Sequence, residues 1–250
     1  MVKFKPTTLD VAEHDGLCEV TLRAERIPAA MANDLEALCD WLEDESTAPV
    51  VVFRGRDGRF TRGIDLSDFS LHKPPDIHGF NKWERALATL ERLPKITIAA
   101  IEGDCRGGGV QLALACDHRI ATSTATFQVD EVKNGFLPGL ATRRLARHVG
   151  MGAARWMILS GQPVEAAEAQ RMGLVERVRD DLDAAIREAA HAFTPVNGTV
   201  VALARRLMND GWNKSHEDFL GDFLAAQHRA ISGEAFLRRV QEEALRPPPP

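Results

Sequence analysis

The chain has 250 residues, a formal net charge of −5 and a hydrophobic fraction of 44%. This length suits one domain with a terminal extension or two small domains, with enough apolar residues for a buried core. Basic and acidic residues are interspersed along the chain, which argues against a nucleic-acid partner and against an anionic membrane surface. No run of 18 apolar residues is present, so no membrane-spanning helix is expected.

The N-terminal stretch MVKFKPTTLDVAEHDG lacks the apolar core of a secretory signal. The cysteines are scattered along the chain without the spacing of metal ligands: Cys18, Cys39, Cys105 and Cys116. We therefore expect reduced thiols, no metal site and a cytoplasmic protein.

In the first half of the chain, short apolar runs alternate with segments of helical spacing. Residues 11–22 predict strand material around a turn at Asp15–Gly16, and Asn33 is expected to cap a helix over 34–43. The remaining expected elements are strands at 50–53 and 96–101, loops at 60–69 and 71–79, helices at 81–93 and 107–116, and an extended segment at 118–127. Strands that alternate with helices predict an α/β fold with parallel strands.

The second half of the chain is dominated by helical spacing. Helices are expected at 144–159, 164–171, 183–192, 200–209 and 219–232, followed by a disordered Pro-rich tail at 247–250. The predicted division is a core of residues 1–195 and a C-terminal helical region of residues 196–250.

The stretch DCRGGGVQLALACD, residues 104–117, places three glycines between an apolar run and a helix. Such glycines at a helix start either cradle an anion on unpaired backbone N–H groups or form a tight turn. A P-loop does not fit, because Val110 and Gln111 stand where it needs lysine and a hydroxyl residue. The spacing also differs from the dinucleotide-binding fingerprint. The glycines alone leave both interpretations open.

Neighbouring motifs add a family resemblance. The segments RFTRGIDLSDF (59–69), GDCRGGGVQLALACD (103–117) and ATFQVDEVKNGFLPG (125–139) together resemble the crotonase, or enoyl-CoA hydratase/isomerase, superfamily. The resemblance continues through RRLARHVG (143–150) and LSGQPVEAAEAQRMGLVERV (159–178), in the family's order. The phrases FTRGIDL, GGGVQL and FQVDEV look most like the dienoyl-CoA isomerase branch.

The resemblance implies a fold and a ligand. The fold is a crotonase-like spiral of β-β-α units, followed by C-terminal helices that build a homotrimer or a dimer of trimers. The ligand is an acyl thioester of coenzyme A, with no separate cofactor. By motif, the backbone N–H groups of Ile64 and Gly108 would hold the thioester oxygen. Donors placed in this way stabilise an enolate more than the ground state.

The resemblance also selects the acid/base residues. Glu131 and Gln111 stand where hydratases of this family carry two carboxylates. The dienoyl-CoA isomerase branch carries acids at the positions of Gln111 and Gly139, and both are missing here. Glutamine can orient water or a substrate group but cannot take a proton. Glu131 is therefore predicted to be the single acid/base, shuttling a proton between two carbons of an enolate with Gln111 beside it.

Further residues are expected to bind the substrate or its CoA moiety: Arg26, Arg62, Asp65, Gly107 and Gly139. Arg26 matches a basic position that in the family lies near the CoA diphosphate, and Asp65 is expected to fix its loop. Simple exposure to solvent is the alternative for each arginine.

Three functions fit these observations. The first is an enoyl-CoA isomerase or hydratase-like enzyme that uses one glutamate. The second is a specialised biosynthetic dehydratase, isomerase or decarboxylase on a CoA-bound or carrier-protein-bound acyl chain. The third is a non-catalytic acyl-CoA-binding protein. Retention of Glu131 favours the first two, because binding alone does not require it.

Overall fold

The computed structural model describes residues 4–68, 77–193 and 197–244. The chain divides into two compact units, Met1–Thr194 and Pro195–Pro250, each described here by itself. Residues 71–76 of the expected surface loop and the tail at 247–250 lie outside the described residues.

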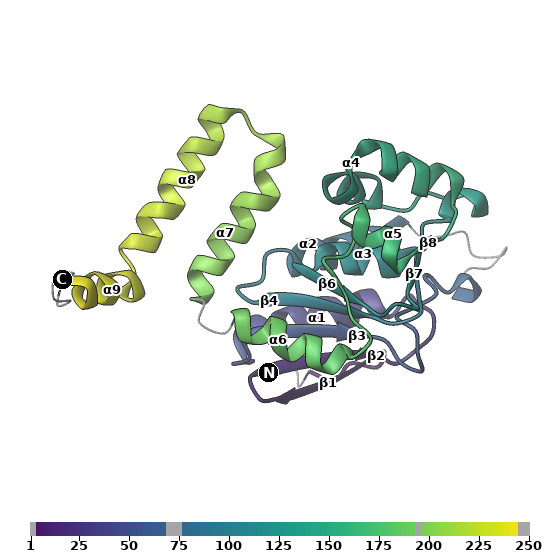
Figure 1. Ribbon diagram of the computed structural model, residues 1–250, viewed down its shortest axis with the longest axis horizontal. Coiled ribbons are helices and arrows are strands. Elements are labelled where there is room, and N and C mark those ends of the chain that lie inside the picture. The colour runs from purple at the N-terminus through teal and green to yellow at the C-terminus, as the bar shows by residue number, and fades with distance from the viewer. Residues whose placement is uncertain (1–3, 69–76, 194–196, 245–250) are drawn as a thin grey trace. The chain divides into compact units, whose positions relative to one another are not determined.

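A six-stranded sheet forms the frame of the first unit (Figure 1). Its strands, in spatial order, are β1 (Leu9–His14), β2 (Leu17–Leu22), β3 (Val50–Arg54), β4 (Ile96–Ile101), β6 (His118–Ala121) and β9 (Arg177–Val178). β1 and β2 form an antiparallel hairpin, and every later neighbouring pair is parallel. The prediction of an α/β fold with parallel strands is confirmed.

The central strands β3 and β4 are buried on both faces, since their successive side chains point to opposite sides and nearly all of them are buried. Val50 and Val52 of β3 pack in one cluster with apolar residues of α6 (Leu182–Phe193). Val51 and Phe53 belong to the larger cluster that includes α1, α2 and α3. Helices therefore cover both faces of the sheet, as a parallel sheet requires.

The remaining helices of the first unit are α1 (Met31–Asp44), α2 (Ile77–Leu90), α3 (Gly108–Ala115), α4 (Ala141–Ser160) and α5 (Ala166–Arg171). The prediction that Asn33 caps the first helix is wrong, because the helix already begins at Met31. The loop prediction is also wrong for residues 77–79, which form the first turn of α2. No proline follows Pro75 in this stretch of the sequence, so nothing in residues 77–79 prevents the chain from being helical.

A second, three-stranded sheet positions the triple glycine. It consists of β5 (Asp104–Arg106), β7 (Thr126–Gln128) and β8 (Val164–Glu165). β5 and β7 run parallel, and directly beyond them the Gly107 N–H donates to the Gln128 carbonyl at 2.9 Å. The start of α3 therefore lies beside the segment that leads from β7 to Glu131.

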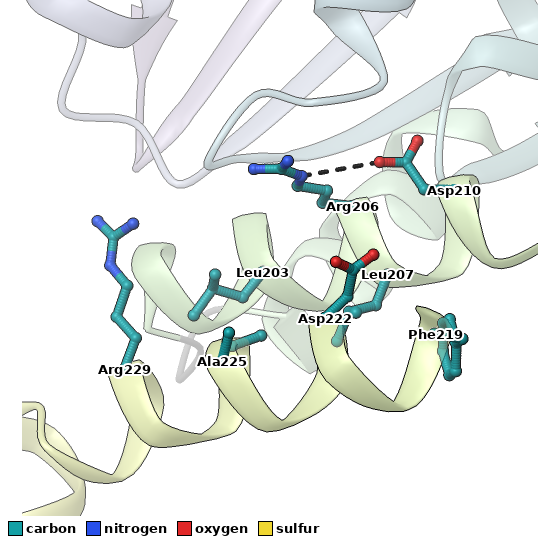
Figure 2. A pocket seen from close by; sticks show the side chains of 9 residues that line it. Leu203, Arg206, Leu207, Asp210, Phe219, Asp222, Ala225 and Arg229 are labelled. Carbon is teal, nitrogen blue, oxygen red and sulfur yellow. Dashed lines mark ion pairs between the residues drawn. The ribbon is translucent and has the colours of Figure 1, made fainter. Parts of the chain in front are cut away.

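The C-terminal unit contains α7 (Gly198–Asp210), α8 (His216–Ile231) and α9 (Glu234–Ala244). The side chains of Asn197 and Ser215 cap α7 and α8 by accepting hydrogen bonds from backbone N–H groups of the first turns. A cavity of about 230 Å³ lies between α7 and α8. Its lining side chains are drawn in Figure 2, with the ion pair between Arg206 and Asp210 dashed; the two groups are 3.7 Å apart. None of the residues expected to form the active site lines this cavity.

In the described ranges, no helix combines the length and the apolar character needed to cross a membrane. The four cysteines are free thiols, and all of them are buried.

Candidate active site

At each glycine of the triplet, an added Cβ would come too close to a different neighbouring residue. Gly107 has φ = +49°, and a Cβ there would lie 2.7 Å from Oε1 of Glu131. A Cβ on Gly109 would lie 2.4 Å from Cγ2 of Thr61. A Cβ on Gly108 would lie 2.9 Å from Cδ1 of Ile27. A Cβ at any of these positions would therefore force a neighbour to shift, most easily at Gly108, where the nearest atom is the end of the Ile27 side chain.

The segment around Ile64 lies directly beside the triplet. The Ile27 N–H donates to the Gly63 carbonyl at 2.8 Å, and the Asp65 N–H donates to the Ile27 carbonyl at 2.9 Å. The backbone groups of Gly63 and Asp65 thus face Ile27. Since successive groups of an extended segment point to opposite sides, the N–H of Ile64 points away from Ile27. On Gly63 a Cβ would lie 3.7 Å from Cα of Gly107, so the two backbones are in contact.

Ile64 and Gly108 together offer two backbone donors. Gly108 is the first residue of α3, and the N–H groups of a first helical turn have no partner inside the helix. Within residues 4–68, 77–193 and 197–244, neither N–H donates to a protein acceptor. An added Cβ on Gly108 would lie 3.7 Å from Cγ1 of Ile64. The structure thus brings together the two residues expected to hold an oxyanion.

Glu131 supplies a carboxylate beside this pair. It begins a short 3₁₀ helix, Glu131–Asn134, and its residue surface is only 3% exposed. In the described part of the chain, both carboxylate oxygens are buried without a hydrogen-bond partner. Burial raises the pKa of Glu131 to about 7; the residue's own backbone N–H acts against this rise, and the charge of Asp130 adds to it by a smaller amount. A carboxyl group with this pKa can both take and give a proton near neutral pH.

Gln111 lies in α3, like Gly108, and a tryptophan of α2 holds its side chain in place. Its side chain is buried, and its amide oxygen accepts from Nε1 of Trp83 at 3.1 Å. Trp83 also packs against the triplet, since its Cζ2 would lie 3.6 Å from a Cβ on Gly108. Trp83 therefore links Gln111 to the expected oxyanion donors.

Gly139 adjoins a buried ion-pair network that the sequence did not predict. A Cβ on Gly139 would lie 2.2 Å from Oε1 of Glu84 and 2.9 Å from Oε1 of Gln111. Glu84 accepts from the Leu140 N–H and pairs with Arg144, each at 2.7 Å. The absence of a side chain at position 139 therefore leaves room for a carboxylate from α2.

Arg144 joins two carboxylates, Glu84 and Glu91, and is the cation of this network. Its side chain is 5% exposed and pairs with Glu91 at 2.7 Å. Replacing Arg144 with Met removes the cation from between two largely buried carboxylates, so we expect the free energy of unfolding to fall by about 3 kcal/mol. Urea unfolding measures this change. The matched control is Arg171→Met, which breaks an exposed pair with Glu168 and should change stability by less than about 1 kcal/mol. Equal effects of the two substitutions would contradict the structural role of Arg144.

The predicted charged binding residues have partners of their own. Arg62 pairs with Glu25 and, at 2.9 Å, with Asp104. The carboxylate of Asp65 accepts hydrogen bonds from the hydroxyl and backbone of Ser67, which hold its pKa below the usual value, with the charge of Arg26 a smaller cause. Asp65 thus stabilises its own turn, and substrate contacts of Arg26, Arg62 and Asp65 remain predictions.

This chain is similar in sequence to known proteins of one family. The sequence model described as Enoyl-CoA hydratase/isomerase matches residues 12–227. An enoyl-CoA-hydratase of Amycolatopsis orientalis is 32% identical over 221 residues, covering 87% of this chain and 98% of the relative. A short-chain-enoyl-CoA hydratase of Clostridium acetobutylicum is 31% identical over 245 residues, covering 94% and 92%.

Solved structures share the fold. The crystal structure of an enoyl-CoA hydratase from Bacillus anthracis superposes with a TM-score of 0.86 at 27% identity, over 94% of this chain and 95% of that chain. A structure from Thermobifida fusca YX in complex with CoA gives a TM-score of 0.80 at 25% identity, over 91% and 94%. The predicted crotonase-like fold with C-terminal helices is confirmed. The chain belongs to the enoyl-CoA hydratase/isomerase family of enzymes.

Proposed function

We propose that this enzyme moves a proton along a CoA-bound enoyl chain through a thioester enolate. The N–H groups of Ile64 and Gly108 would hold the thioester oxygen, and Glu131 would be the single acid/base. One observation carries the proposal: a buried carboxylate without a hydrogen-bond partner in the described ranges lies beside two free backbone donors. A buried carboxylate without a hydrogen-bond partner destabilises the folded protein, so a catalytic role is the best explanation for a glutamate at position 131.

The reaction needs no further reagent. Glu131 removes a proton from the α-carbon of a 3-enoyl thioester, and the resulting dienolate carries its negative charge on the thioester oxygen. The two N–H donors stabilise that charge. The protonated Glu131 then returns the proton to the γ-carbon, which moves the double bond into conjugation with the thioester.

Hydration through two carboxylates fits this site less well. Gln111 cannot take a proton, and its amide oxygen already accepts from Trp83. The acyl group would be carried on coenzyme A, as supported by the structural relative from Thermobifida fusca YX that holds CoA. A binding-only protein would have no use for the partnerless Glu131, which disfavours a non-catalytic role.

The pH dependence of activity tests the state of Glu131. A base must be ionised to act, so we expect kcat/KM to rise with pH through a midpoint near the pKa of about 7. A glutamate of ordinary pKa would place the midpoint near 4.5 instead. A pH–rate profile on a 3-enoyl-CoA separates these cases, and a profile that stays flat around neutral pH would contradict the assignment.

The reaction itself is tested with two substrates. Purified enzyme is assayed with crotonyl-CoA and with a 3-enoyl-CoA, each beside the Glu131→Gln variant. Conversion of the 3-enoyl-CoA that depends on Glu131 supports the proposal. If instead the enzyme hydrates crotonyl-CoA and this hydration depends on Glu131, the proposed isomerisation is wrong and the enzyme is a hydratase that uses one carboxylate. No conversion of either substrate would contradict both and favour a specialised, carrier-bound substrate.

We further propose that the C-terminal unit builds a homotrimer or a dimer of trimers. In α8, Phe223 and Leu224 are 40% and 57% exposed, which leaves apolar surface for a second copy of the chain. Light scattering measures the molar mass in solution, and a monomer at micromolar concentration would contradict this assembly.

A further inference from the structure

Arg119 is a buried cation that the proposed reaction does not use. It lies in β6, and its residue surface is only 1% exposed. Its side chain pairs with the carboxylate of Glu176, which also accepts from the Arg119 backbone N–H at 2.6 Å. Its Nε donates to the Leu174 carbonyl at 2.8 Å. A buried charge is costly unless it is paired and hydrogen-bonded, so these bonds fix the orientation of the guanidinium group.

The guanidinium group of Arg119 also holds the C-terminal end of α3. Its Nη1 donates to the carbonyls of Cys116 and Ala113, at 2.9 and 3.4 Å. The last carbonyls of a helix have no partner inside the helix, and a cation at that end is stabilising. Arg119 therefore ties the end of the helix to strand β6.

His148 of α4 binds the same end of α3. Its Nδ1 lies 3.3 Å from Nη2 of Arg119, and because arginine can only donate, this ring nitrogen must accept. The hydrogen of the neutral ring is then on Nε2, which is the donor for the hydrogen bond between His148 and the backbone of Leu114. Burial lowers the pKa of His148 to about 4, with the charges of Arg119 and Arg147 as smaller causes, so the ring is neutral at pH 7.

The opposite end of α3 carries one of the two expected oxyanion donors. The helix runs from Gly108 to Ala115, all of its residues are buried, and in the described part of the chain no side chain caps its N-terminus. A helix of this length measures about 12 Å and moves as a hydrogen-bonded unit, so a shift of its C-terminal end displaces the Gly108 N–H as well. The Ile64 N–H lies in a separate segment that is bonded to Ile27, so such a shift changes the distance between the two donors.

We propose that Arg119, together with His148, is a positioning residue that holds α3 so that the Gly108 N–H stays in place beside the Ile64 N–H. The inference rests on the proposed function, because it assumes that these two groups bind the thioester oxygen. A misplacement of about 1 Å can lower a rate about a hundredfold. Arg119→Met removes the bonds to α3, so it should lower kcat for a 3-enoyl-CoA at least about tenfold.

Binding titrations with butyryl-CoA and with free CoA separate this role from a general loss of stability. Partial unfolding weakens the binding of both ligands by the same factor, whereas a displaced Gly108 weakens only the contact with the thioester oxygen. Arg119→Met should therefore reduce the preference for butyryl-CoA over free CoA by at least about threefold. His148→Phe removes one bond to α3 and leaves Arg119 in place, so it should reduce this preference by a smaller factor. If Arg119→Met does not fold, His148→Phe decides, and an unchanged preference in that variant would overturn the inference.

Lys95 provides a matched control for the loss of a buried cation at a helix end. It is buried, and its ammonium group donates to the carbonyls of Ser46 and Ala48, at 2.9 and 2.7 Å, just beyond the end of α1. None of the expected site residues lies in α1, so Lys95→Met should keep the full preference for butyryl-CoA. A preference that survives Arg119→Met, or one that Lys95→Met reduces equally, would overturn the inference while leaving the proposed function intact. Equal wild-type affinities for the two ligands would overturn both.

Discussion

Replacing Glu131 with Gln is expected to lower turnover of a 3-enoyl-CoA by about a thousandfold, since general acid–base catalysis contributes about 10²–10⁴. Glutamine has the same shape and can occupy the same place beside Gly107, so the affinity for acyl-CoA should change by less than about threefold. Steady-state kinetics with a separate binding titration measures both quantities. The control is Glu165→Gln, which neutralises an exposed carboxylate and should leave turnover unchanged.

The same substitution should stabilise the fold at alkaline pH. Folding raises the pKa of Glu131 from 4.5 to about 7, so the folded protein holds this proton more tightly than the unfolded chain. Wild-type stability therefore falls as pH rises between these values. At pH 8 the uncharged amide of the Glu131→Gln variant should add about 3 kcal/mol to the free energy of unfolding, and at pH 4 almost nothing.

Urea unfolding of the two proteins at both pH values measures this difference. A variant that loses turnover but gains stability only at alkaline pH identifies a residue kept for chemistry at the expense of the fold. A variant that unfolds more easily at pH 8 would show that Glu131 is a structural carboxylate instead.

The second large effect is expected at Gly108. A Cβ there would lie 2.9 Å from Cδ1 of Ile27 and 3.7 Å from Cγ1 of Ile64, so the branched side chain of Gly108→Val should push the start of α3 away from Ile64 and separate the two N–H donors. Losing such donors raises the barrier by about 2.7–4 kcal/mol, and kcat/KM should fall at least about a hundredfold.

Comparing the affinities for free CoA and for butyryl-CoA separates a loss of the thioester contact from general damage to the fold. Free CoA has no thioester oxygen, so its affinity should be nearly unchanged in Gly108→Val while the affinity for butyryl-CoA falls. The control is Gly152→Val, because Gly152 lies in α4 with nothing within 4 Å of an added Cβ. Normal acyl-CoA affinity in Gly108→Val would remove this residue from the oxyanion site.

The sequence predicted the strands and helices that have a clear hydrophobic periodicity and that end at glycine or proline. The apolar runs at 50–53 and 96–101 are central strands β3 and β4, and the glycines at 107–109 do start a helix. Strands of two or three residues, such as β8, are too short for alternation to be visible. Helix α9 was also missed, since it follows α8 after only Ser232 and Gly233.

The sequence predicted which residues lie together where each of them belongs to a motif, while their chemical roles stay predictions. Ile64, Gly108 and Glu131 come from three separate segments, and the structure brings them together. The buried network of Glu84, Glu91 and Arg144 was not predicted, because these pairings with α4 depend on tertiary packing. One local signal was present: Glu84 and Glu91 are seven residues apart within the helix predicted at 81–93, which places them on the same side of that helix.

We expect Glu131 to take a proton from the α-carbon of the bound thioester and to return it to the γ-carbon. An isotope label tests this most directly: a 3-enoyl-CoA that carries deuterium at the α-carbon is incubated with wild-type enzyme or with Glu131→Gln, and the deuterium of the acyl chain is followed by NMR. With the wild-type enzyme deuterium should leave the α-carbon, for the γ-carbon or for water, and with the variant only at the background rate. Equal loss of deuterium from the α-carbon with both proteins, under conditions where both bind the thioester, would contradict this role of Glu131.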